Sequence, residues 1–107
     1  MTSALKNKKK IETVFDKGFA IKAKGLLLKG YDFKDGETKF GISVSKKNFP
    51  TAVKRNLVKR RIREQVKSLG FLGLMSKGVS FFIIYTSKQL LSSKEIRESF
   101  KELGRKI

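Results

Sequence analysis

Residues 54–67 read KRNLVKRRIREQVK, a stretch in which an apolar helical stripe runs beside a strongly basic surface. Apolar side chains recur with the spacing of one helix face, which predicts a helix from about residue 51 to residue 69 with that face buried. The stripe consists of Val58, Ile62, Val66 and Leu69. At about 100° per residue, four other side chains gather on the opposite side. These are Asn56, Arg60, Arg63 and Lys67.

The charge of this stretch indicates an anionic ligand. It holds seven basic residues and a single acid, Glu64. A helix face that is merely solvated usually mixes the two signs, because opposite charges four residues apart stabilise a helix. Like charges that crowd together cost stability unless a partner neutralises them. The pattern therefore favours a partner rich in phosphate groups.

The whole chain is as basic as this helix, with 26 Lys and Arg against 9 Asp and Glu and a net charge of +17. Such a balance points first to nucleic acid and second to an anionic membrane surface. The length suits a single domain, residues 1–107, and an apolar fraction of 39% with nine phenylalanines can fill one core.

Several kinds of chemistry are excluded by composition. The sequence has no cysteine and no histidine, so it lacks disulfides, a thiol nucleophile and the commonest general base. The acids are scattered, and we expect no carboxylate cluster of the kind that a two-metal nuclease uses. Any catalytic groups would then come from a partner. The longest apolar run, residues 79–85, is too short to span a bilayer, and no secretory signal is evident, so we expect a soluble, cytoplasmic protein.

Periodicity and turn signals predict a small α+β domain with the element order α-β-β-α-β-α. The expected elements are a helix over residues 8–17 ended by Gly18, a strand over 20–33, a hairpin turn at Asp35-Gly36, a strand over 39–45, the basic helix, a strand over 79–85 and a helix after a capping box at Ser92 and Glu95. The strand over 79–85 is almost wholly apolar, which predicts a central strand covered on both faces. We expect it to lie parallel to the strand over 39–45.

Three lysines at the start of the first helix also point to phosphate. Lys8, Lys9 and Lys10 would lie in its first turn, where the helix dipole disfavours cations. Their cost to the helix predicts that they bind phosphate.

Two segments carry a family resemblance, residues 43–47 (SVSKK) and residues 52–64 (AVKRNLVKRRIRE). They closely resemble the protein subunit of bacterial ribonuclease P, whose signature is a strand ending in Ser-Lys-Lys, then Ala-Val and an Arg-Asn-Arg box that continues as Lys-Arg and Arg-Glu along one helix. The resemblance implies a ribosomal-protein-S5-domain-2-like fold with a left-handed βαβ crossover. Physical preference alone predicts a right-handed crossover in about 98% of cases.

The resemblance also implies a function. The protein would pair with a large catalytic RNA that uses Mg²⁺, bound mainly by the RNA, to hydrolyse the bond joining the 5′ leader to precursor transfer RNA. The protein itself would be a monomer with no tightly bound metal. Its implied RNA-binding residues are Lys46, Lys47, Lys54, Arg55, Asn56, Lys59, Arg60, Arg63 and Lys67. A cleft for the single-stranded leader would involve Ile11, Phe15, Lys29 and Tyr31.

The chain departs from this pattern at three places. The Gly-Asn that the family has before Ala-Val is replaced by residues 48–51 (NFPT), with one extra residue, and the third residue of the box is Leu57. Ile11 and Lys29 occupy cleft positions that are usually aromatic. We therefore expect a cleft with more electrostatic attraction and less stacking, in which Tyr31, on the same strand face as Lys29, compensates in part.

Other functions are open on the residues alone. A ribosomal or other structural RNA-binding protein would have the same composition. A protein-only nuclease is disfavoured by the missing histidine and the scattered acids. A membrane-surface protein is the weakest alternative, because the apolar stripe of the basic helix is needed for the core.

Overall fold

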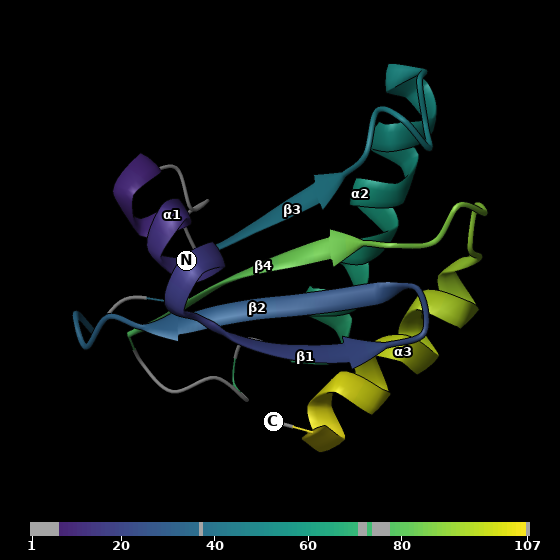
Figure 1. Ribbon diagram of the computed structural model, residues 1–107. Coiled ribbons are helices and arrows are strands. Elements are labelled where there is room, and N and C mark those ends of the chain that lie inside the picture. Colours follow the sequence, from purple (N-terminus) through teal and green to yellow (C-terminus); the bar gives the residue numbers. More distant parts are fainter. Residues whose placement is uncertain (1–6, 37, 71–72, 74–77, 107) are drawn as a thin grey trace.

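The computed structural model describes residues 7–36, 38–70, 73 and 78–106. Four strands form one mixed sheet in the order β1-β2-β4-β3, with α1 on one face and α2 and α3 on the other (Figure 1). In chain order the elements are α1 (Lys8–Lys17), β1 (Phe19–Ala23), β2 (Leu26–Asp32), β3 (Phe40–Val44), α2 (Ala52–Ser68), β4 (Val79–Tyr85) and α3 (Ser93–Lys106). The α+β class is confirmed.

The connection through α2 has the uncommon hand. β3 and β4 are parallel neighbours, as expected, with Ile42 opposite Ile83. In Figure 1 both strands point to the right, β3 lies above β4, and α2 lies behind the sheet. A right-handed connection between strands so placed would run in front of the sheet. The crossover is therefore left-handed, as the resemblance implied and against the general preference.

The expected single strand over residues 20–33 is wrong. The chain turns back at Lys24 and Gly25, so that β1 and β2 form an antiparallel hairpin in which Ala23 pairs with Leu26. Gly25 has a φ of 74°, a conformation that glycine adopts without steric cost. The alternating pattern continues across this short turn, and the sequence therefore resembles one long strand.

The expected hairpin at Asp35-Gly36 is also wrong. β2 and β3 are not neighbours, because β4 lies between them and is antiparallel to β2. The segment after β2 is instead a connection that leads the chain past β4 to the sheet edge. Gly36 still has a φ of 76°, so the local turn signal is real although the pairing is not.

The core lies between the sheet and the two helices behind it. β2 and β4 contribute alternate side chains to this face, and α2 contributes the predicted stripe, with Leu69 only partly buried. α3 packs beside α2 and begins with the expected capping box, in which the Ser92 N–H donates to Glu95 Oε2 at 2.8 Å. Among the described residues, the largest fully buried side chains of this core are Leu26, Leu28, Val58, Ile62, Val66, Phe81, Ile83, Ile96, Phe100 and Leu103. Val14 of α1 is also fully buried but lies outside this core cluster.

Gly18 ends α1, as expected, but the reason is close contact with β2. Its φ of −71° is open to any residue. A Cβ at this position would lie 2.2 Å from the Val14 carbonyl oxygen and 2.5 Å from that of Gly30. Glycine is needed here because the chain passes directly from the helix into β1 against the neighbouring strand.

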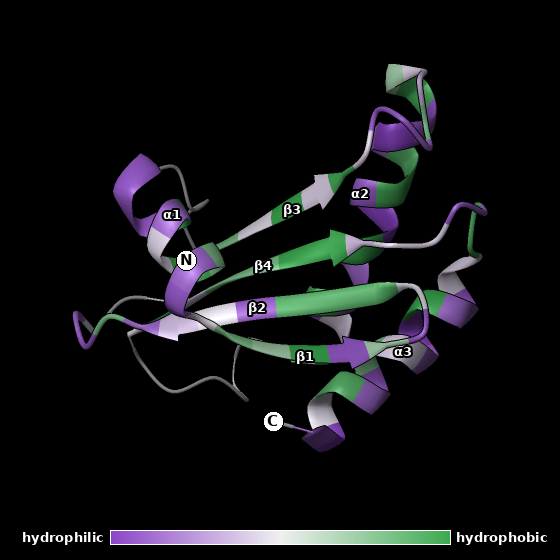
Figure 2. Cartoon of the chain, in the orientation of Figure 1, coloured by the Kyte–Doolittle hydropathy of each residue, from purple (hydrophilic) through white to green (hydrophobic). Residues whose placement is uncertain are grey.

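β4 is apolar along nearly its whole length (Figure 2) but is not covered equally on its two faces. Phe81, Ile83 and Tyr85 are buried toward α2 and α3, whereas Phe82 and Ile84 are only half-buried. The expectation of a strand covered on both faces is therefore wrong for its second half. These two side chains lie on the face that α1 covers only in part.

Candidate RNA interface

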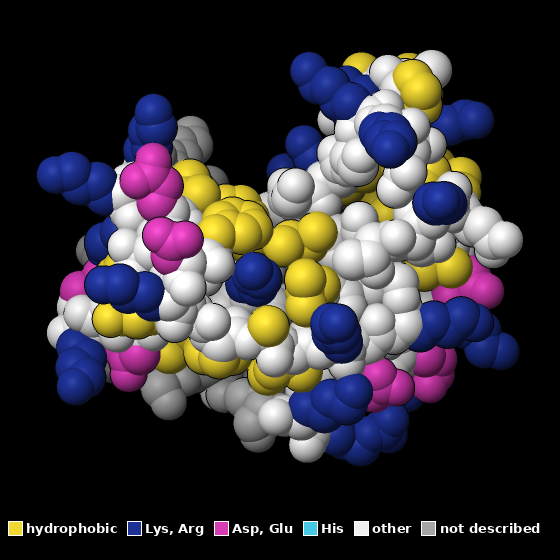
Figure 3. All heavy atoms as spheres, viewed as in Figure 1, with side chains coloured by type: hydrophobic (Ala, Val, Ile, Leu, Met, Phe, Trp, Pro, Cys, Tyr) yellow, Lys and Arg dark blue, Asp and Glu magenta, His cyan; other side chains and the backbone are white. Residues whose placement is uncertain are grey.

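The open sheet face forms the floor of a hollow between α1 and the start of α2. Strand pairing brings side chains of neighbouring strands together there, with Lys29 opposite Phe82 and Leu27 opposite Ile84. All four are half-buried. Figure 3 shows this hollow, with hydrophobic side chains along its floor and Lys and Arg side chains on both sides of it. A floor of apolar surface between basic rims fits an extended single strand of RNA, whose bases stack while its phosphates contact cations.

α1 forms one wall of the hollow. Ile11 is half-buried and Phe15 is 39% exposed, one helical turn further along. The Phe15 ring lies 5.4 Å from the Phe82 ring, centroid to centroid, at an interplanar angle of 40°. The Lys29 ammonium lies 5.6 Å from the Phe15 ring centroid. Two of the four expected cleft residues, Phe15 and Lys29, are thus brought together with Phe82, and Ile11 lies one helical turn before Phe15.

The fourth expected cleft residue, Tyr31, lies on the same face as Lys29, opposite Ser80. Its ring is half-buried and packs edge-on against Phe33, with centroids 4.8 Å apart. Phe33 in turn lies under the Lys10 ammonium, which is 5.0 Å from its ring centroid. Tyr31 therefore belongs to a group of residues that connects β2 to α1.

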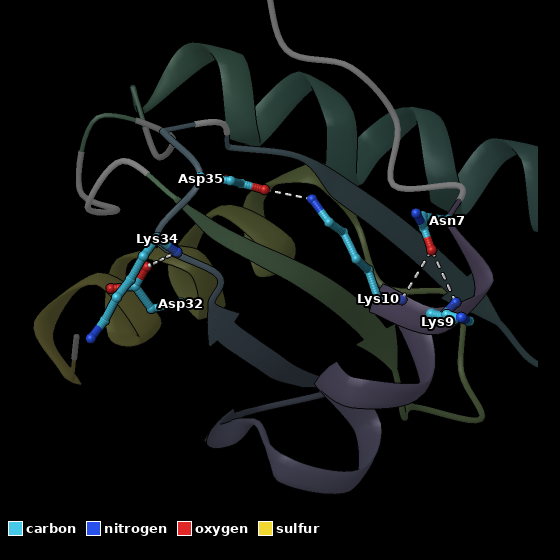
Figure 4. Close-up of polar contacts among 6 residues, drawn as sticks. All are labelled: Asn7, Lys9, Lys10, Asp32, Lys34 and Asp35. Atoms are coloured by element: carbon cyan, nitrogen blue, oxygen red, sulfur yellow. Dashed lines mark hydrogen bonds and ion pairs between the residues drawn. The ribbon is translucent and has the colours of Figure 1, made fainter.

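Lys10 also forms an ion pair with Asp35, with 2.5 Å between Nζ and Oδ2 (Figure 4). Its side chain is 26% exposed. Phosphate binding by the lysines of the first turn stays a prediction, and Lys10 differs from the other two because its ammonium also holds α1 against the loop after β2. Lys8 and Lys9 are exposed. Asn7 caps the helix by accepting hydrogen bonds from the Lys9 and Lys10 N–H groups (Figure 4).

The basic side of α2 faces away from the core. The four residues predicted to lie on this side are all exposed, namely Asn56, Arg60, Arg63 and Lys67. Lys59 is half-buried. Arg60 lies 3.9 Å from Glu64 with its side chain 69% exposed, a surface pair worth about 0–1 kcal/mol that leaves the arginine available to a ligand. Three further lysines are exposed at the end of β3 and the start of α2. They are Lys46, Lys47 and Lys54.

Arg55 differs from these residues because its guanidinium supports the loop before α2. Nη1 donates to the carbonyl oxygens of Phe49 and Pro50, each at 2.8 Å. Phe49 is buried, and its ring lies 5.6 Å from that of Tyr85. The loop at residues 48–51, which departs from the family pattern, is thus anchored to the core by the buried Phe49 side chain. Arg55 was expected to bind RNA, and at least one of its nitrogens serves the loop instead.

Two floor residues were missed by sequence reasoning, namely Phe82 and Ile84. The available signal was the apolar character of β4 on both of its faces, which was interpreted as complete burial. Only the pairing of β4 with β2 and β3 shows that these side chains line an open surface.

Among the described residues there is neither a cluster of metal-binding side chains nor a helix able to span a membrane. Within residues 7–36, 38–70, 73 and 78–106, no three His, Cys, Asp or Glu side chains are grouped so that they could hold a metal ion. In the same residues, no helix is both long and apolar enough to cross a bilayer.

Comparison with known proteins identifies the family to which the sequence belongs. The sequence matches the family model for Ribonuclease P over residues 1–107. It is 32% identical over 81 residues to the ribonuclease P protein component of Psychrobacter sp. (strain PRwf-1). The aligned region covers 72% of this chain and 58% of that relative. The matched region is thus less than two thirds of the relative's length.

Solved structures share the fold. The ribonuclease P protein of Staphylococcus aureus superimposes with a TM-score of 0.80 at 22% identity, covering 98% of this chain and 94% of that one. The protein of Thermotoga maritima gives the same TM-score and identity and covers 98% and 97%. At this identity the likeness shows the fold alone. Because the family model matches the whole sequence, the chain belongs to the ribonuclease P protein family.

Proposed function

We propose that this chain is the protein subunit of a cytoplasmic ribonuclease P, binding both the catalytic RNA subunit and the 5′ leader of precursor transfer RNA. The complex would act as an endoribonuclease that removes the leader and so produces the mature 5′ end. The protein would be monomeric when free. Chemistry would belong to the RNA subunit and its Mg²⁺ ions, while the protein binds and positions RNA.

The observation that carries this proposal is the hollow on the open sheet face. A structured duplex presents its phosphates outward and hides its bases, whereas an extended single strand offers both to a protein. Half-buried Phe82 and Ile84 supply an apolar floor, Phe15 supplies an exposed ring in the wall, and Lys29 places a cation between them. This arrangement suits a single-stranded leader better than it suits a helix.

The second binding surface is the basic side of α2. It is separate from the hollow floor, because α2 packs on the opposite face of the sheet. Exposed arginines and lysines with a single acid among them, Glu64, can make sequence-independent contacts to phosphates, as required of a surface that docks on a large folded RNA. One chain could therefore hold the RNA subunit and the leader at the same time.

Reconstitution tests the proposal. The purified chain is mixed with a bacterial ribonuclease P RNA and a precursor transfer RNA, and leader removal is followed at low Mg²⁺, where the RNA alone is inactive. We expect cleavage at the mature 5′ end only when both components are present. An absence of stimulation at every Mg²⁺ concentration contradicts the proposal, and cleavage by the protein alone indicates a protein-only nuclease.

A structural RNA-binding protein of ribosomal type is the second candidate, because the exposed face of α2 serves either role. The two candidates differ in their dependence on the leader. A protein that uses the hollow binds precursor more tightly than mature transfer RNA in the presence of the RNA subunit, whereas a structural RNA-binding protein does not discriminate between them.

A further inference from the structure

Phe82 is the aromatic residue at the centre of the open sheet face. It lies on β4 between Lys29 of β2 and Gly41 of β3, its two partners across the sheet. A Cβ at Gly41 would lie 2.4 Å from Phe82 Cε1 and 2.7 Å from Cζ. The ring therefore lies across the glycine, on a surface that only glycine leaves free.

Phe82 is held on its other side by α1. The rings of Phe82 and Phe15 are in contact, with their centroids 5.4 Å apart and tilted by 40°. Their separation leaves no room for a base between them, so a base can stack only on the surface that they present together to the hollow. Lys29 is held beside this surface, with Nζ 3.5 Å from the Phe15 carbonyl oxygen.

We propose that Phe82, seated on Gly41 and joined to Phe15, is the principal stacking platform for a base of the RNA strand in the hollow, with Lys29 binding an adjacent phosphate. This inference rests on the proposed function. It identifies Phe82 as the aromatic residue that compensates for the missing aromatic rings at Ile11 and Lys29. Every base can stack on an aromatic ring, but a purine covers more of it than a pyrimidine does. The platform therefore favours adenine over uracil.

The fold contains a matched control for Phe82 on the opposite sheet face. Phe19 of β1 also lies across a glycine, since a Cβ at Gly30 would lie 2.7 Å from Phe19 Cζ. Phe19 is 43% exposed, but it lies on the face that α2 and α3 cover. Phe82→Leu and Phe19→Leu thus make the same chemical change on two faces of one sheet.

The test measures binding of the full chain to single-stranded oligoadenylate, oligouridylate and an abasic oligomer of equal length by fluorescence anisotropy. We expect Phe82→Leu to weaken oligoadenylate binding about tenfold, to reduce the preference for adenine over uracil, and to leave the abasic oligomer unchanged. Phe82→Tyr keeps the ring and should retain the preference. Phe19→Leu should behave as the wild-type chain.

The proposal is overturned if Phe82→Leu binds all three oligomers as the wild type does. It is also overturned by an equal loss for all three, because a loss that includes the abasic oligomer reflects damaged folding or charge and not stacking. These outcomes are independent of the reconstitution assay. Successful reconstitution with unaltered oligomer binding by Phe82→Leu would reject the platform alone, and failed reconstitution would reject the proposed function alone.

Discussion

At the scale of single residues, cations that look equivalent in the sequence have different roles. Lys8 and Lys9 are exposed, whereas the adjacent Lys10 contacts Asp35 and the Phe33 ring. Arg55 donates to two loop carbonyls, whereas Arg60 on the next turn is exposed. The difference arises because a cation near the sheet or a loop has carbonyls, carboxylates and rings within reach, while one on the outer side of a helix stays exposed even where it pairs with a neighbour, as Arg60 does with Glu64.

Tyr31 is predicted to act on the leader through α1. Loss of its edge-on contact with Phe33, worth about 0.5–1.5 kcal/mol, should loosen the wall of the hollow. Tyr31→Ala and Lys10→Met should each weaken binding of a precursor with a long leader while leaderless transfer RNA is bound as before, and Tyr31→Phe should have no effect. Filter binding to the reconstituted complex measures these affinities.

Lys8→Met is the control for the Lys10 substitution, because it removes the same charge from the same turn of α1 and leaves the ion pair between Lys10 and Asp35 in place. If Tyr31→Ala weakens leader binding and Lys10→Met does not, Tyr31 contacts the leader directly as a stacking residue. If leaderless transfer RNA loses as much affinity as the precursor, Tyr31 has no role in the leader cleft.

At the scale of elements, the start of α3 contains a pH-dependent cap. The Ser92 N–H donates to the Glu95 carboxylate, and the Glu95 N–H donates to the Ser92 hydroxyl oxygen at 3.2 Å, so the cap is reciprocal. The backbone hydrogen bond from Ser92 is the main cause that lowers the pKa of Glu95 below its ordinary value of 4.5, and Lys24 adds a smaller contribution. A carboxyl whose pKa is lower in the folded state stabilises that state only when ionised.

Glu95→Gln should therefore lower the melting temperature at neutral pH. The difference from the wild type should be fully present above pH 4.5 and should vanish as the pH falls through the lowered pKa of the folded state. Thermal unfolding followed by circular dichroism, at a series of pH values from about 2.5 to about 7, measures this difference in melting temperature. Glu98→Gln on the same helix is the control, and an equal effect of both substitutions would show that general charge, not capping, is responsible.

At the scale of the whole molecule, the chain carries a net charge of +17, but only one helix face is expected to dock on RNA. Arg60→Ala with Arg63→Ala should lower the slope of log K against log salt concentration by about one to two units, because two phosphate contacts are lost. Arg97→Ala with Arg105→Ala removes the same charge from exposed positions on α3 and should leave the slope nearly unchanged. Equal slopes for both double variants would mean that total charge, and not the α2 face, governs binding of the RNA subunit.

Much of this protein was determined by its sequence alone. The bounds of β4, the buried stripe and exposed basic side of α2, the cap of α3 and the family motif all depend on residues close together in the chain. Such local patterns record which side of an element is apolar and which ligand its charge would attract. They were sufficient for the α+β class, for the parallel pairing of β3 with β4 and for the presence of the basic helix α2.

Only the tertiary structure decided which surfaces remain open. The chain reverses at Gly25, β4 separates β2 from β3, and the pairing of the three strands places Phe82 between Lys29 and Gly41. A shift of one residue in that pairing would turn Phe82 into the core and Phe81 toward the hollow. Periodicity shows that a strand is apolar on both faces, but whether each face meets a helix or a ligand depends on partners distant in sequence.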